Sequence, residues 1–273
     1  MIHPQAISEQ LLFSTVRLST DSGSGTGFFF HFKTDDQKQI PVIVTNKHVI
    51  NNKLEQEVNF SLHIKDMGKP TNENIDIRLN ARWVFHPTLD LCCAFTNPLM
   101  SQIKQRIQKE IFYIPFTEEL IWEDSKLEEI QAVEDILMVG YPIGLFDRKN
   151  NLPLFRKGIT ATHPAINFND ESIGIIDCSC FPGSSGSPVL LYNDNGFTDR
   201  KGTTHLGAKR IVFLGVLCSA PILNAQGNIE ITEIPTQQKI VTRTQVMVNL
   251  GYYIKAKEIL KLKEEVLKIA NIK

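Results

Sequence analysis

The sequence predicts an all-β protein whose strands fall into two successive halves, with one helix between the halves and another at the C-terminus. Short stretches of alternating apolar and polar residues, bounded by glycine and polar clusters, recur along most of the chain. Two segments instead repeat their apolar residues every three or four positions, which is typical of an amphipathic helix. A chain of 273 residues is long enough for one large barrel or for two fused halves.

The first half has the pattern of antiparallel strands joined by turns. We expect a short helix over residues 5–13, followed by strands over residues 14–19, 28–32, 41–45, 58–64 and 75–84. Residues 21–27 are rich in glycine and serine, so we expect a flexible turn there. Apolar residues recur at helical spacing between Pro98 and Phe112, which predicts a linking helix. We therefore expect one domain over residues 1–112 and a second over residues 113–273.

The second half resumes the strand pattern and ends in a helix. Strands are expected over residues 136–139, 158–162, 173–180, 188–192 and 211–219. An apolar face at helical spacing predicts the final helix over residues 256–270. Residues 221–249 form an insertion with two interpretations: a lid that contacts a ligand, or a β-hairpin packed on the barrel through residues 229–234 and 240–248.

The composition is that of an ordinary globular protein. Its 29 basic and 30 acidic residues nearly cancel, so nothing indicates a nucleic-acid partner. No segment is long and apolar enough to span a membrane, and residues 1–18 lack the pattern of a signal peptide. The five cysteines, an odd number that includes the adjacent Cys92 and Cys93, do not form a disulfide framework. We therefore expect a cytoplasmic protein with reduced thiols.

The most informative motif is the run of glycine, serine and proline at residues 183–188, which follows an expected strand. A tight turn of small residues can present one hydroxyl beside exposed backbone N–H groups, which makes Ser185 a candidate nucleophile. His48 lies where a buried strand ends, and Asp90 opens an apolar strand, where its carboxylate needs a hydrogen-bond donor such as a histidine Nδ1–H. Taken singly, each of these three features is more often structural.

In this order and with these flanks, the three residues resemble the trypsin/chymotrypsin superfamily of serine proteases. The bacterial Deg or high-temperature-requirement type, here without its C-terminal peptide-binding PDZ domains, is the most similar branch. The similar stretches are residues 25–28, 44–49, 90–94, 140–144, 158–161, 182–187 and 251–255, so the resemblance covers about residues 10–270. It implies two perpendicular six-stranded antiparallel β-barrels, with a linker helix, a C-terminal helix and a site in the cleft between the barrels.

The resemblance also implies roles for individual residues. Ser185 would be the nucleophile and His48 the base, with Asp90 orienting the histidine. The backbone N–H groups of Gly183 and Ser185 would form the oxyanion hole. The specificity pocket would be formed by residues 177–181, 217–221 and 250–252, specifically Ser179, Cys218, Ser219, Ala220 and Gly251. Because Ser179 carries no charge, we expect a neutral or apolar side chain at the cleaved residue, unless Asp177 turns inward. No metal or cofactor is implied.

Two residues depart from the pattern of the superfamily. Ser184 replaces the aspartate that pairs with a newly cut N-terminus in trypsin-like zymogens, so we do not expect activation by that ion pair. Ser187 replaces a common glycine and adds a side chain close to the oxyanion turn.

We therefore expect a cytosolic serine endopeptidase, restrained by loop ordering, by a protein partner or by substrate choice, with a bacterial stress or defence role as a further hypothesis. A catalytically silent module that holds an extended peptide in the same cleft is the alternative. An α/β-hydrolase esterase is disfavoured because that fold places the acid and the histidine after the serine.

Overall fold

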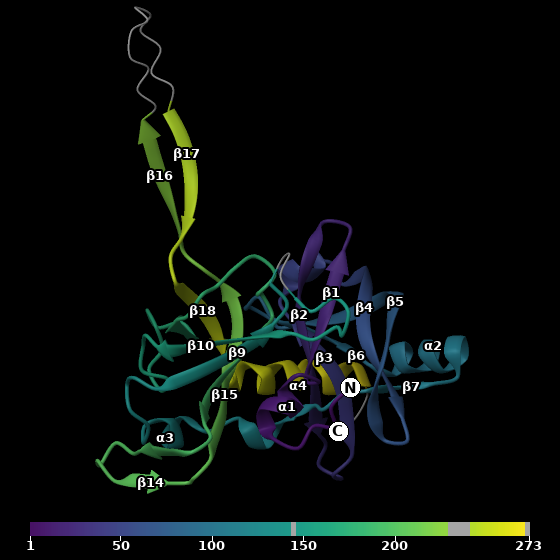
Figure 1. Ribbon diagram of the computed structural model, residues 1–273, viewed down its shortest axis with the longest axis horizontal. Helices are drawn as coiled ribbons and strands as arrows, with labels where there is room; N and C mark the ends of the chain where they lie inside the picture. The colour runs from purple at the N-terminus through teal and green to yellow at the C-terminus, as the bar shows by residue number, and fades with distance from the viewer. Residues whose placement is uncertain (143–145, 229–240, 271–273) are drawn as a thin grey trace, which may run out of the picture.

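The computed structural model describes residues 1–142, 146–228 and 241–270, which form two β-barrels lying side by side (Figure 1). The first barrel follows the expected antiparallel pattern. Its strands are β1 (Thr15–Thr20), β2 (Gly23–Lys33), β3 (Gln39–Thr45), β4 (Glu55–Asp66), β5 (Lys69–Phe85) and β6 (Cys92–Phe95). They pair in the order β1-β2-β3-β6-β5-β4, and pairing of β1 with β4 closes the ring.

The second barrel is also closed and six-stranded. Its strands are β9 (Asp135–Gly140), β10 (Leu154–Thr160), β11 (Ile173–Asp177), β12 (Pro188–Asn193), β15 (Arg210–Ser219) and β18 (Leu250–Lys255). They pair in the order β10-β11-β18-β15-β12-β9. The two closed rings confirm the predicted chymotrypsin-like architecture.

Short helices and strands connect the barrel strands or lie outside the two rings. The helical segments are α1 (Ile7–Leu11), η1 (Lys47–Ile50), α2 (Asn97–Ile107), η2 (Glu118–Leu120), α3 (Asp124–Leu127) and α4 (Lys257–Ala270). The remaining strands are β7 (Glu110–Phe112), β8 (Phe116–Thr117), β13 (Gly196–Thr198), β14 (Thr204–Leu206), β16 (Ile222–Asn228) and β17 (Val241–Met247). No helix in the described parts of the chain is long and apolar enough to cross a membrane.

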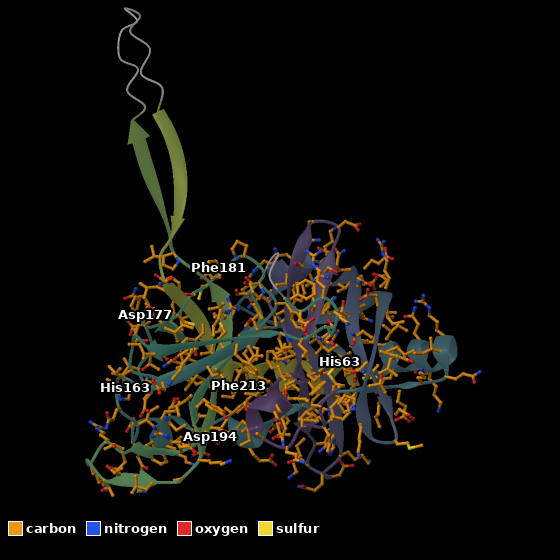
Figure 2. All side chains as sticks on the ribbon, viewed as in Figure 1. His63, His163, Asp177, Phe181, Asp194 and Phe213 are labelled. Atoms are coloured by element: carbon orange, nitrogen blue, oxygen red, sulfur yellow. The ribbon has the colours of Figure 1, made fainter. Side chains whose placement is uncertain are left out.

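A shared aromatic core joins the barrels. Phe213 on β15 of the second barrel packs edge-on against Phe28 of β2, with ring centroids 5.4 Å apart, and stacks on Phe116 of β8 at 5.3 Å. All three rings are buried, and Figure 2 shows Phe213 between the two halves. Burying a phenylalanine side chain contributes about 2–3 kcal/mol, so this cluster is a substantial part of the contact between the halves.

The C-terminal helix α4 covers the junction of the barrels. Its buried residues Ile259, Leu262 and Val266 pack into the core cluster that contains Phe28 and Phe213. In Figure 1 the yellow helix runs across both halves. The helix therefore contacts first-barrel residues although it follows the last strand of the second barrel.

The glycine-rich segment differs from the expected flexible turn. Only Asp21 and Ser22 form the turn, and residues 23–27 belong to β2, in register with β1. Their small size has a packing reason. A Cβ at Gly25 would lie 2.7 Å from the Val49 methyl carbons, and one at Gly27 would lie 2.9 Å from Leu18 Cδ1.

The linking helix is also shorter than predicted. It ends at Ile107 because Gln108 adopts a left-handed conformation with φ 52°. The following residues form β7, in which Ile111 is buried and paired with Ile64 of β4. First-barrel pairing then continues as far as β8, which pairs with β2.

The insertion in the second half forms a hairpin of β16 and β17. These strands pair with each other, as the hairpin interpretation expects, and their backbone extends away from the barrel (Figure 1). The expected strand over residues 229–234 lies outside the described residues.

Candidate active site

His48 is placed by the end of a buried strand. β3 ends at Thr45, and the chain turns into the single 3₁₀ turn η1, which is closed by the left-handed residue Asn51 with φ 58°. Within that turn Val49 and Ile50 are buried, whereas the His48 side chain is 42% exposed. The apolar neighbours therefore anchor the turn and direct the imidazole outward.

Asp90 lies on the loop between β5 and β6 and contacts His48 twice. Its Oδ2 lies 2.6 Å from Nδ1 of the imidazole, and its Oδ1 accepts the backbone N–H of His48 at 3.1 Å. Asn46 Nδ2 donates to the Asp90 carbonyl at 2.7 Å and so fixes the backbone of the loop. Since an ionised carboxylate only accepts hydrogen bonds, the proton of a neutral His48 ring is on Nδ1, and Nε2 is a free acceptor.

Ser185 is the second residue of the second of two consecutive tight turns, which share Ser184. Ser184 N–H donates to Phe181 O at 3.0 Å, and Ser187 N–H donates to Ser184 O at 3.0 Å. In each turn the third position is a glycine with positive φ, 86° at Gly183 and 83° at Gly186, which is the type II pattern and favours glycine strongly. At Gly186 a Cβ would in addition overlap the carbonyl oxygen of Thr26.

Some backbone groups of this loop are hydrogen-bonded to neighbouring segments, and two N–H groups are not. Ser185 O accepts Thr26 N–H at 2.9 Å, and Gly183 O accepts the Thr26 hydroxyl at 3.2 Å. Gly186 N–H donates to Leu217 O at 2.9 Å. Among the described residues, the N–H groups of Gly183 and Ser185 donate to no acceptor. The two donors predicted to form the oxyanion hole are therefore unengaged, while the groups around them are fixed.

The structure brings the three predicted residues together across the junction of the barrels. His48 and Ser185 line one pocket of about 440 Å³, together with Gly183, Pro182 and the turn between β1 and β2. No hydrogen bond between described atoms joins His48 to Ser185, as is common for catalytic pairs before substrate binds. Asp90 reaches the pocket only through its bonds to His48.

Comparison with known proteins places the chain in a family. A family model described as "Trypsin-like peptidase domain" matches residues 25–196, a range that includes His48, Asp90 and Ser185. The chain belongs to the trypsin-like peptidase family. No curated protein matches its sequence.

Several solved structures are similar over nearly the full length. Rv3671c from M. tuberculosis, in an inactive form, has a TM-score of 0.46 at 14% identity and covers 99% of this chain and 98% of its own. The scabies mite inactivated protease paralogue S-I1 has a TM-score of 0.47 at 11% identity, covering 95% and 96%. The thermostable serine protease AL20 from an extremophilic microorganism has 0.46 at 14% identity, covering 94% and 97%.

In this peptidase, Arg156 of β10 contacts the serine loop, residues 181–187, and this contact was not predicted from the sequence. Its Nη1 donates to Ser184 Oγ at 2.6 Å and to Ser179 O at 3.2 Å. Burial lowers the pKa of the guanidinium from its usual value. Ser184, which replaces the aspartate of trypsin-like zymogens, is itself buried. The Arg156 guanidinium therefore contacts this position from within the barrel. The strand expected over residues 158–162 begins earlier, at Leu154, so Arg156 lay outside the predicted strand.

The second departure, Ser187, is accommodated by a glycine. Ser187 is fully buried, and a Cβ at Gly140 would overlap its hydroxyl oxygen. The same Cβ would lie 2.7 Å from Thr26 Oγ1, which accepts the N–H of Tyr141. The extra atoms of Ser187 thus occupy space that Gly140 leaves open.

The predicted specificity-pocket residues come from neighbouring segments of the second barrel. Cys218 and Ala220 are partly buried and Ser219 is exposed, while Ser179 is partly buried. Gly251 is buried, and a Cβ there would lie 2.6 Å from Cys180 Sγ and 2.7 Å from Leu217 Cδ1. Burial raises the pKa of the Cys218 thiol to about 11. The assignment of these residues to substrate binding stays a prediction.

Asp177 does not turn inward. Its side chain is exposed, and Figure 2 shows it on the outer side of the second barrel. Ser179, which was predicted near the base of the pocket, instead accepts a hydrogen bond from the cationic Arg156 at its carbonyl oxygen.

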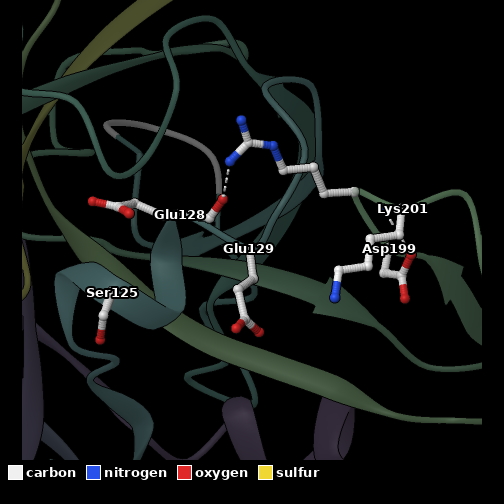
Figure 3. Close-up of a pocket in the computed structure, with 6 residues that line it drawn as sticks. Ser125, Glu128, Glu129, Asp199 and Lys201 are labelled. Carbon is white, nitrogen blue, oxygen red and sulfur yellow. Dashed lines mark hydrogen bonds between the residues drawn. The ribbon is translucent and has the colours of Figure 1, made fainter.

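A larger pocket of about 570 Å³ lies away from these residues (Figure 3). It is lined by Ser125, Glu128, Glu129, Asp199, Arg200 and Lys201, and Arg200 Nη1 donates to Glu128 O at 2.8 Å. Its charges are of both signs, and it contains none of the predicted site residues. In the described ranges, no group of three or more histidine, cysteine, aspartate or glutamate residues could hold a metal ion.

Proposed function

We propose that this peptidase is a serine endopeptidase that acts through Ser185, His48 and Asp90. The observation that carries the proposal is the His48 ring, which is bonded to Asp90 through Nδ1 and shares a pocket with Ser185 and two unengaged N–H groups. Acyl transfer requires a nucleophile, a base and an oxyanion site. The pocket brings one candidate for each to a single place.

The proposed reaction proceeds in two halves. Ser185 Oγ attacks the scissile carbonyl carbon while its proton passes to Nε2 of His48, and the resulting oxyanion accepts hydrogen bonds from the Gly183 and Ser185 N–H groups. The C–N bond then breaks as His48 returns the proton to the leaving amine. Water deacylates the enzyme by the same route, and Asp90 stabilises the imidazolium in both halves.

The proposed preference is for a neutral or apolar side chain at the cleaved residue. Ser179 supplies no negative charge, and the guanidinium of Arg156 lies behind it, bonded to its carbonyl. A lysine or arginine side chain in such a pocket would face a like charge, which disfavours binding.

We also propose a reducing, cytosolic environment and restraint of the activity in the cell. All five cysteines are free thiols, which supports the first point. The restraint is proposed to come from loop ordering, a protein partner or substrate choice, in a bacterial stress or defence role.

The proposal is tested by comparing the wild type with Ser185→Ala. We expect a fluorophosphonate to label only the wild type, and a lysate digest to gain new N-termini only with the wild type. The residues preceding those termini report the preference, and a majority of lysine and arginine would contradict it. A wild type that neither labels nor cleaves, yet binds extended peptides, would instead support the silent peptide-binding module.

A further inference from the structure

The buried side chains of His86 and Glu258 connect helix α4 to the loop that carries Asp90. His86 follows β5 and opens that loop, and Glu258 lies in the first turn of α4. Nε2 of His86 lies 3.1 Å from Oε2 of Glu258, and each side chain is only 2% exposed. The two residues are 172 positions apart in the sequence. Burying such groups is costly unless they are hydrogen-bonded, so this contact constrains both elements.

The second ring nitrogen of His86, Nδ1, accepts hydrogen bonds from the backbone of the loop itself. This nitrogen lies 3.3 Å from the backbone N of Thr88 and 3.0 Å from that of Leu89, and both N–H groups donate to it. His86 N–H donates to Leu91 O at 2.9 Å. These bonds enclose Asp90 between bonded residues and leave its carboxylate directed at His48.

The network also fixes which ring nitrogen carries the proton. Because Nδ1 accepts two N–H groups, it has no proton, and the proton of the neutral ring is on Nε2, from which it is donated to Glu258. The charged groups around the ring are Glu258, Lys261 on the same helix and Lys47. Lys47 Nζ donates to the His86 carbonyl at 2.6 Å, which ties the residue next to His48 to the same loop.

We propose that His86 and Glu258 are positioning residues, through which α4 sets the geometry of the Asp90–His48 pair. This inference rests on the proposed function of that pair. It means that the helix after the second barrel completes the acid-base machinery of the first barrel. Release of α4 would leave the loop without its side-chain support while Ser185 stays in place.

The test uses the full chain with four single substitutions, one of which is repeated in an Asp90→Ala background. Glu258→Ala removes the acceptor, whereas Glu258→Gln keeps an acceptor oxygen at the same position. His86→Asn keeps an oxygen near the place of Nδ1 but loses the contact with Glu258. Lys268→Ala is the control, since it breaks the exposed pair with Glu265 on the same helix.

We expect Glu258→Ala and His86→Asn to lower kcat by between about tenfold and a hundredfold, with KM nearly unchanged, because small misplacements of reacting groups have effects of this size. Glu258→Gln is expected to restore most of the activity, and Lys268→Ala to leave it unchanged. In an Asp90→Ala background, Glu258→Ala should have no further effect, because both changes act through one group. Equal losses in both backgrounds would indicate general destabilisation and overturn the inference.

A second measurement does not require turnover. The low-field proton NMR signal of the His48 Nδ1–H bonded to Asp90 should shift or broaden in Glu258→Ala and stay in place in Lys268→Ala. An unchanged signal in a folded Glu258→Ala variant would overturn the inference even if the wild type hydrolyses no peptide. If the signal changes in Glu258→Ala but the wild type hydrolyses no peptide, the positioning role is supported and the proposed function is contradicted.

Discussion

The two barrels hold their parts of the site in different ways. In the first barrel, His48 and Asp90 lie next to the ends of the strands β3 and β6 and are bonded to each other. In the second barrel, Ser185 lies on a loop of two consecutive glycine turns, and two carbonyls of that loop accept hydrogen bonds from Thr26 of the first barrel. The His48–Asp90 pair is thus bonded within one barrel, whereas the serine loop is held from both barrels, by Thr26 of the first and by Arg156 and Leu217 of the second.

The sharpest test of the first barrel is Asp90→Asn, which keeps the size of the side chain and removes its charge. The amide no longer holds the His48 proton on Nδ1, so we expect kcat to fall by roughly 10⁴-fold, while the free energy of unfolding changes little. Steady-state kinetics and urea denaturation of the purified variant provide the measurements. Activity within tenfold of the wild type would show that Asp90 is not the orienting group.

The dependence of the serine loop on the first barrel is tested at Thr26. Its hydroxyl donates to Gly183 O and accepts from Tyr141 N–H, so Thr26→Val leaves two buried backbone groups without a partner. We expect kcat to fall by about a hundredfold and stability by about 1–3 kcal/mol. Thr26→Ser, which keeps the hydroxyl, is the control. If the valine variant matched the serine variant in kcat, the serine loop would not depend on this contact.

Support from within the second barrel is tested at Arg156. Arg156→Met removes the donor to Ser184 Oγ and Ser179 O. We expect kcat to fall by about tenfold, since one indirect contact is lost while the bonds from Thr26 remain. Ser184→Ala should show a similar loss, and the double variant should be little worse than either single one. Additive losses would mean that the two residues act separately.

The smallest expected effect concerns stability at the end of β18. Lys255 is buried, its Nζ has no hydrogen-bond partner among the described residues, and burial lowers its pKa to about 8. In the unfolded chain the pKa of a lysine is about 10.4, so below pH 8 Lys255 is protonated in both the folded and the unfolded state. The folded protein then bears the full free-energy cost of burying the charge. We expect Lys255→Met to raise the free energy of unfolding by about 1 kcal/mol at pH 7.

That advantage should shrink as the pH rises above 8, because the folded wild type releases its proton before the unfolded chain does. Urea denaturation of both proteins at pH 7 and pH 9 measures the difference. A difference that does not change with pH would contradict the assigned cause.

Local patterns were sufficient to predict two β-rich halves, whereas the barrels and the three proposed catalytic residues followed from the resemblance of the motifs to the trypsin/chymotrypsin superfamily. Alternation along the chain marks long strands, and β3, β12 and β15 lie close to their predicted positions. The motif around Ser185 is local in sequence, so it too could be read directly. By contrast, β7 and β8 have only three and two residues, and they pair with the parts of β4 and β2 that extend beyond β1.

The supporting contacts could not be predicted, because they join distant parts of the chain. Thr26 and Gly183 are 157 positions apart, and the sequence around either residue does not indicate that the two are in contact. Residues 23–27 were predicted to be a turn because glycine and serine are common in turns. In the folded chain they form a strand that contacts the serine loop, where larger side chains would collide with their neighbours.

The contact between β2 and the serine loop has a consequence for protein engineering. A chimera that joins this chain's second barrel, as its new barrel, to the first barrel of another family member would separate the serine loop from Thr26, which bonds two of its carbonyls. Grafting residues 25–27 together with the new barrel is the smallest exchange that preserves the match, and Gly25, whose Cβ would lie 3.3 Å from Ser185 O, must travel with it.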